Sequence, residues 1–173
     1  MVLMLWHFGF YSFLGWCTER IFAWLTHSPV RRRRCLLFLP MCPVYGLSMA
    51  LLLILPQPWL QFPCILLAGL VLPSAVEYGY HWAGERLFRI RFWDYSHHFG
   101  NLHGRICLSF SLAWVALVSL AVTMLQPFIA ALIAAIPPAV SLFFLLLLTA
   151  DTVCSLWFLS CTHDLTALRY AWG

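Results

Sequence analysis

The strongest constraint on this chain is a long run without charge. From Ile106 to Ala150, 45 consecutive residues include no Asp, Glu, Lys or Arg. As one α-helix the run would extend roughly 68 Å, about twice the thickness of the hydrocarbon core of a bilayer. It therefore predicts more than one membrane-spanning helix, with breaks at Gln126-Pro127 and Pro137-Pro138, because proline interrupts a helix.

The composition supports a membrane protein. Hydrophobic residues make up 63% of the 173 residues and charged residues 9%, whereas a soluble domain has about 45–50% and about 25%. A chain of this size cannot bury such an excess in a core. We expect one all-α transmembrane domain over residues 1–173, with about five spans. The predicted helices cover about 3–25, 42–59, 63–87, 104–125 and 138–160, and a polar cytoplasmic loop covers 88–103. Residues 127–137 could instead begin a longer, kinked fifth helix.

The basic residues predict the orientation. All ten are arginines. Besides Arg20, they gather at Arg31 to Arg34, between Arg86 and Arg105, and at Arg169. The connections between the second and third helices and between the fourth and fifth hold none. Under the positive-inside bias this pattern predicts an external amino terminus, an internal carboxyl terminus and a multi-pass protein of the cell membrane. The net charge of +4 thus reflects orientation, and we expect no nucleic-acid partner.

The absence of lysine excludes a class of site. A phosphate-binding G-x-x-x-x-G-K-[ST] loop needs its lysine, and the chain has none. The chain therefore contains no ATPase motif, and any dependence on ATP requires a separate ATPase subunit.

Three acids are predicted to share one depth in the membrane. Glu19, Glu77 and Asp151 fall about 13–16 residues from the starts of their helices, or roughly 20–24 Å into a core of about 30 Å. A charge near the centre of a bilayer costs about 2.5–3.5 kcal/mol on insertion scales, so such residues usually face the interior of the bundle. Arg105, in the first turn of the predicted fourth helix, can hold carboxylates with its guanidinium fork.

These residues predict a polar chamber that opens to the cytoplasm, with residues 91–105 as its floor. Helical spacing of four places Glu77, His81 and Glu85 on one face; we interpret Glu85 and Arg89 as an ion pair at the helix end. The candidate binding residues are Glu19, Glu77, His81, Asp94, Asn101, His103, Arg105 and Asp151. We expect no catalytic residue, metal ligand or cofactor, although His81, His97, His98 and His103 could be considered for a metal.

Five segments carry a family resemblance. They read YSFLGWCTE (11–19), PVYG (43–46), EY (77–78), ERLFRIRFWDYS (85–96) and NLHGRICL (101–108). Together they resemble the ABC-transporter type IV permease family, the CmpB-type membrane proteins, over about residues 8–125. The resemblance implies a multi-pass protein whose matched polar residues are Glu19, Glu77, Glu85, Asp94, Asn101 and Arg105.

The leading functional hypothesis is a permease or transporter subunit that binds a polar or ionic solute, or a lipid head group, in an inner-leaflet polar chamber. Its expected partners are membrane lipids, a separate ATPase subunit and further copies of the same chain. One alternative is an intramembrane enzyme acting on a lipid or isoprenoid, with Asp94, His97, His98 and His103 as acid–base groups. Another is a structural or regulatory membrane partner, in which the acids and Arg105 only hold helices together.

Overall fold

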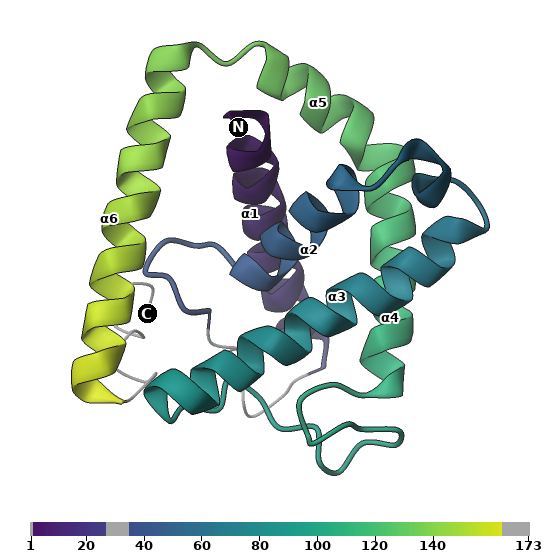
Figure 1. The fold of residues 1–173 in the computed structure, drawn as a ribbon, viewed down its shortest axis with the longest axis vertical. Coiled ribbons are helices and arrows are strands. Elements are labelled where there is room, and N and C mark those ends of the chain that lie inside the picture. Colours follow the sequence, from purple (N-terminus) through teal and green to yellow (C-terminus); the bar gives the residue numbers. More distant parts are fainter. Residues whose placement is uncertain (1, 27–34, 164–173) are drawn as a thin grey trace.

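The computed structural model describes residues 2–26 and 35–163, and in this part of the chain the regular structure is helical, without a β-strand (Figure 1). The predicted all-α fold class is confirmed. Arg31 to Arg34 and Arg169, on which the orientation depends, lie outside the described residues. In order, the elements are α1 (Val2–Leu25), α2 (Pro43–Ile54), η1 (Gln57–Leu60), α3 (Cys64–Ala83), η2 (Gly84–Phe88), α4 (Leu108–Leu120), η3 (Ala121–Leu125), α5 (Gln126–Ala134) and α6 (Pro138–Thr162).

Three helical runs are long and apolar enough to cross a membrane: Cys64–Phe88, Leu108–Ala134 and Pro138–Thr162. Helix α1 has 24 residues, which rise about 36 Å and also suffice by length. Helix α2 has only 12 residues, a rise of about 18 Å. The long apolar helices identify a membrane protein, and about five spans fit this architecture; the inside–outside orientation stays a prediction.

Three boundaries of the second and fourth helices differ from those predicted, including the end of the fourth, which lies at Ala134 instead of near Leu125. The second helix ends at Ile54 instead of near Trp59, because Pro56 and Pro58 cannot continue its hydrogen bonds. The fourth helix begins at Leu108 instead of near Gly104. Gly104 has a left-handed φ of 69°, and Cys107 is extended, with φ −146° and ψ 158°. Arg105 therefore lies in a turn before the helix and not in its first turn.

The uncharged run folds into two long pieces. Elements α4, η3 and α5 form one continuous helical run, Leu108–Ala134, so residues 127–134 extend the fourth helix and do not begin the fifth. The π-helical turn Ala121–Leu125 precedes Pro127, where a wider turn accommodates the ring. The run bends there towards α6 (Figure 1), and Pro137-Pro138 marks the start of α6.

Small residues bring α1 and α2 close together. Helix α1 packs chiefly on α2, and α3 packs on α4 and α2. A Cβ atom added at Gly46 would collide with the Ser12 hydroxyl and the Phe8 carbonyl, and one added at Gly15 would collide with the Tyr45 ring. The absence of a side chain at these two positions sets the distance between the two helices.

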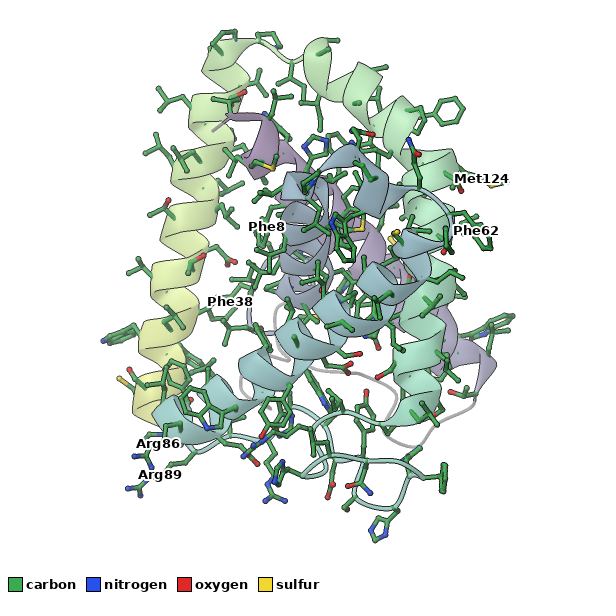
Figure 2. All side chains as sticks on the ribbon, turned by 45° about the vertical axis from the view of Figure 1, so that its right-hand side comes forward. Phe8, Phe38, Phe62, Arg86, Arg89 and Met124 are labelled. Atoms are coloured by element: carbon green, nitrogen blue, oxygen red, sulfur yellow. The ribbon has the colours of Figure 1, made fainter. Side chains whose placement is uncertain are left out.

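Helix α6 makes few contacts with the other described helices. Near its start, the Trp6 ring stacks on Phe144 with centroids 4.5 Å apart, and its indole N–H donates to the Ser141 hydroxyl at 2.8 Å. Most of its large side chains are exposed. Apolar side chains such as Phe62 and Met124 also project from the opposite flank, whereas Arg86 and Arg89 lie at one end of the molecule (Figure 2). This distribution fits a surface in contact with lipid chains.

We expect Gly46→Ala to lower the free energy of unfolding by about 1–3 kcal/mol, the usual cost of overpacking a close contact. Gly79→Ala is the matched control, because a Cβ atom there meets nothing within 4 Å. Gly79→Ala should raise the free energy of unfolding by about 0.5–1 kcal/mol, because alanine is a better helix former than glycine. Thermal unfolding in detergent measures both, and equal melting temperatures for the two variants would contradict the close packing at Gly46.

Candidate functional site

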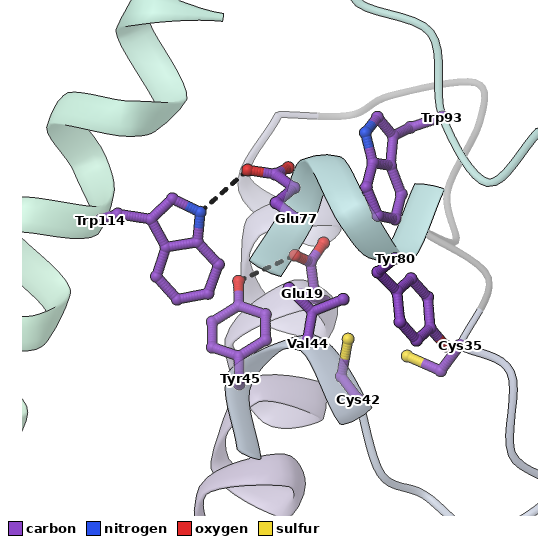
Figure 3. Close-up of a pocket in the computed structure, with 9 residues that line it drawn as sticks. All are labelled: Glu19, Cys35, Cys42, Val44, Tyr45, Glu77, Tyr80, Trp93 and Trp114. Carbon is purple, nitrogen blue, oxygen red and sulfur yellow. Dashed lines mark hydrogen bonds between the residues drawn. The ribbon is translucent and has the colours of Figure 1, made fainter. Parts of the chain in front are cut away.

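Two buried carboxylates from different helices meet at one small cavity (Figure 3). Glu19 comes from α1 and Glu77 from α3, and their side chains lie in the interior at 8% and 1% exposure. The cavity measures about 10 Å³, close to the space that a single water molecule needs. Its wall is formed by Glu19, Cys35, Cys42, Val44, Tyr45, Glu77, Tyr80, Trp93 and Trp114.

Aromatic side chains supply hydrogen bonds to both acids. The Tyr45 hydroxyl donates to Glu19 Oε1 at 2.8 Å. Glu77 accepts from the Tyr95 hydroxyl on Oε1 at 3.1 Å and from the Trp114 indole N–H on Oε2 at 3.0 Å. A buried carboxylate needs such donors, since burial without them is costly. Both acids line this water-sized space, and carboxylate oxygens suit a cation or a hydrogen-bond donor.

Arg105 has a different partner from the one predicted. Its Nε and Nη2 atoms donate to Glu85 Oε2 at 2.9 and 2.7 Å, and its Nη1 donates to the Tyr78 hydroxyl at 2.7 Å. Within the described residues, the side-chain contacts of Arg105 do not include Glu19, Glu77 or Asp151. The late start of α4 is the reason, because it leaves Arg105 in a turn beside the end of α3.

Glu85 is the centre of a second polar cluster. Its Oε1 lies 2.9 Å from Arg91 Nε and 3.5 Å from His81 Nε2. The predicted Glu85–Arg89 pair is absent from the described ion pairs, because Arg89 adopts a left-handed φ of 57° and ends the helix. The hydrogen bond to Glu85 raises the pKa of the Arg105 guanidinium above its ordinary value, against the opposing effect of desolvation.

His81 lies between the two clusters. It stands one helical turn from both Glu77 and Glu85, and only 1% of it is exposed. Its Nε2 faces Glu85, while Nδ1 has no hydrogen-bond partner in the described part of the chain. The Trp93 ring meets the imidazole edge-on, with centroids 5.0 Å apart. His81 is thus a buried polar residue with one ring nitrogen, Nδ1, that can still form a hydrogen bond.

Asp94 and Asn101 shape the connecting loop. Asp94 Oδ1 accepts from the Ser96 amide at 2.9 Å. The Asn101 side chain donates to the Ser96 and His98 carbonyls at 3.1 and 3.0 Å, and its Oδ1 accepts from the Gly104 amide at 3.2 Å. Both residues are exposed, and the contacts of both hold the loop instead of facing the acid cavity.

The two other predicted residues also lie apart from this cavity. His103 is exposed, and its Nδ1 lies 3.2 Å from the Tyr78 hydroxyl, beside the Arg105 cluster. Asp151 is half-buried on α6, and its Oδ2 accepts from the Leu39 amide at 3.4 Å. The nearby Ser155 hydroxyl accepts from the Phe38 amide at 3.3 Å. Asp151 thus fastens the segment before α2 to α6.

The sequence analysis missed the aromatic donors. Tyr45, Tyr78 and Tyr95 lie in three of the segments that carry the family resemblance, so the signal was available in the tyrosines of those motifs. Trp114 lies in an apolar helix beyond them, where an indole suggests only packing or an interfacial position. Its role as a donor to Glu77 depends on the packing of α4 against α3.

Comparison with protein families decides the affiliation of the chain. The family described as "Putative ABC-transporter type IV" matches residues 6–158. The chain belongs to this family. Comparison with curated proteins and with solved structures gave no match. The match of this ABC-transporter family covers the acid cavity, the Glu85–Arg105 cluster, the connecting loop and most of α6.

We expect Arg105→Lys to lower the melting temperature, because an ammonium group cannot donate to Glu85 and Tyr78 with the fixed fork of a guanidinium. Arg86→Lys is the matched control at an exposed position and should shift the melting temperature by no more than about 1–2 °C. Thermal unfolding in detergent compares the two. Equal, small shifts would show that the fork contributes nothing.

The loop should loosen in acid. The hydrogen bond from the Ser96 amide lowers the pKa of Asp94 below its ordinary value. The stabilisation from the ionised Asp94 is therefore fully present at pH values above the ordinary aspartate pKa of about 4. It is lost as the pH falls through the lowered pKa of Asp94. Hydrogen exchange of the Ser96 amide, corrected for intrinsic rates between about pH 6 and pH 3, should show protection falling with acid. Asp94→Asn should remove this dependence; an unchanged profile in Asp94→Asn would assign it to another group.

Proposed function

We propose that this chain is the membrane-embedded subunit of an ABC-type transporter and that Glu19 and Glu77 bind the ammonium group of a polar solute or of a lipid head group. In this proposal the chain is a multi-pass protein of the cell membrane, with the acid cavity in the inner third of the bilayer. A separate ATPase subunit supplies the energy, because the chain has no lysine and hence no phosphate-binding loop of the Walker type.

One observation carries the choice of ligand. Two carboxylates from separate helices line one cavity of about 10 Å³. A space of this size accepts a water-sized group, and a primary ammonium is such a group. Carboxylates are acceptors and an ammonium carries three N–H donors, so charge and hydrogen bonding favour the same occupant. An anionic group would meet two acids and is disfavoured.

The geometry favours transport over the enzymatic alternative. The alternative needs Asp94 and the loop histidines to act together on a substrate. Asp94 instead holds the Ser96 amide, His98 packs against the rings of Tyr95 and Phe110, and His103 contacts Tyr78. These side chains are spread along the loop, whereas the two buried acids share one cavity.

The test compares salts at equal ionic strength. Ammonium chloride should raise the melting temperature of the purified protein relative to sodium chloride. At ten times the dissociation constant the gain is about 1.4 kcal/mol, or about 3–5 °C for a chain of this size. Glu77→Gln should abolish the difference between the two salts. Because the comparison is made within each variant, a change in folding stability cancels.

Asp151→Asn is the matched control, since it also converts a membrane-embedded acid to an amide but lies outside the cavity; it should keep the difference between the salts. Nanodiscs of phosphatidylethanolamine and phosphatidylcholine then separate a lipid head group from a free solute, because only the former lipid carries N–H donors. Equal melting temperatures in both salts and in both lipids would overturn the proposal.

A further inference from the structure

We propose that a second cavity in the bundle holds one hydrocarbon chain of a membrane phospholipid. This cavity measures about 260 Å³ and lies between α1, α2 and the α4–η3 run. Its volume lies just below the range of small-molecule sites, about 300–1,000 Å³. The inference concerns a separate space from the acid cavity and does not depend on the proposed function.

The cavity has the shape of a slot along the helices. On α1 its lining extends from Tyr11 to Ile21, and on the antiparallel α4–η3 run from Trp114 to Leu125. Ten residues of helix rise about 15 Å, so the slot is elongated along the helix axes. In a membrane-spanning bundle this direction is also that of the lipid chains.

Contacts at both ends keep the slot open. The Tyr11 hydroxyl of α1 donates to Gln126 Oε1 of α5 at 2.8 Å. Towards the other end, the rings of Phe22 and Phe110 meet edge-on, with centroids 6.0 Å apart. Between these two bridges α1 packs on α2, α4 packs on α3, and α1 and α4 make few contacts with each other. Helix α1 and the α4–η3–α5 run are thus joined at the two ends of the slot and separated between them.

The walls favour an apolar occupant. Tyr45 and Trp114 line both cavities, but their polar atoms donate to Glu19 and Glu77. The Thr18 hydroxyl donates to the Leu14 carbonyl of its own helix at 2.9 Å. Lining residues such as Leu14, Met49 and Leu117 offer no hydrogen bonds. Water needs two to four polar partners to fill a cavity, and these walls leave it few.

The position of the slot identifies the source of the chain. Ile21, Leu120 and Leu125 line it and are also exposed, at 58%, 49% and 39%. The slot is therefore continuous with the lipid-facing surface of the bundle. At this depth in a bilayer the abundant molecules are phospholipids, and their acyl chains have the chemistry and the direction that the slot requires.

A photoactivatable phosphatidylcholine with a diazirine on its acyl chain tests the inference in nanodiscs. After illumination, label on α1 and α4 peptides should saturate near one equivalent per protein as the mole fraction of the probe rises. Label on the exposed face of α6, for example at Leu142, Phe143 and Leu146, should rise linearly as for bulk lipid. Linear labelling of α1 and α4 in the native chain would overturn the proposal.

A second labelling experiment uses Cys17→Phe. Cys17 lines the slot, so a phenylalanine ring at this position should fill the slot. Labelling of α4 should fall at least fivefold, with labelling of α6 unchanged. Cys154→Phe is the matched control, because Cys154 is exposed on α6. Undiminished α4 labelling in Cys17→Phe would also overturn the inference. If Cys17→Phe does not fold, the saturation curve of the native chain alone decides whether the slot holds an acyl chain. Glu77→Gln should keep the labelling of α1 and α4, whether or not ammonium binds to the acid cavity.

Discussion

Keeping the carboxylate of Glu77 inside an apolar bundle requires donors from the protein, because the bilayer supplies none. The donors come from two directions: Tyr95 belongs to the loop after α3, and Trp114 belongs to α4. One acid thereby links a long helix, the following loop and the next helix. If the loop were displaced, Tyr95 could no longer reach Glu77. The hydrogen-bonded turn around Asp94, Asn101 and Gly104 therefore helps to keep Tyr95 within hydrogen-bonding distance of Glu77.

The polar residues divide into a buried group and a group at the end of the bundle. Glu19 and Glu77 accept hydrogen bonds from aromatic side chains, and a space the size of a water molecule lies beside them. Glu85 instead meets the cations Arg91 and Arg105, where part of each side chain reaches solvent. Partly exposed ion pairs contribute little stability, but a forked contact fixes geometry. The Glu85–Arg105 pair therefore serves to hold the loop against α3, and its charges do not neutralise the buried acids.

Hydropathy and proline positions predicted the class of fold and most of the helices, because both act locally. The uncharged run had to be divided, and Pro137-Pro138 divides it. The partner of Arg105 could not be predicted in the same way. It depends on where α4 begins, and that boundary depends on the left-handed Gly104 and the extended Cys107. A shift of four residues moved Arg105 from a helical turn to the side of Glu85. The convergence of Glu19 and Glu77 was predicted from their depth, whereas the position of Asp151 depends on how α6 docks, for which a sequence gives no periodic signal.

The two cavities share a wall, and this arrangement links the acids to the membrane. Tyr45 and Trp114 pack with their ring centroids 4.5 Å apart, their polar atoms towards the carboxylates and their carbon faces towards the apolar slot. An aromatic ring with one polar atom is suited to such a boundary, since it satisfies a buried acid on one side and packs against hydrocarbon on the other. The same two side chains thus separate the space proposed for an ammonium group from the space proposed for an alkyl chain. A molecule with both parts could occupy both spaces only if the Tyr45 and Trp114 rings moved apart, and that movement would remove a hydrogen bond from each acid. Under the two proposals, a molecule that reached the acids from the lipid side would therefore break the Tyr45 and Trp114 contacts to Glu19 and Glu77.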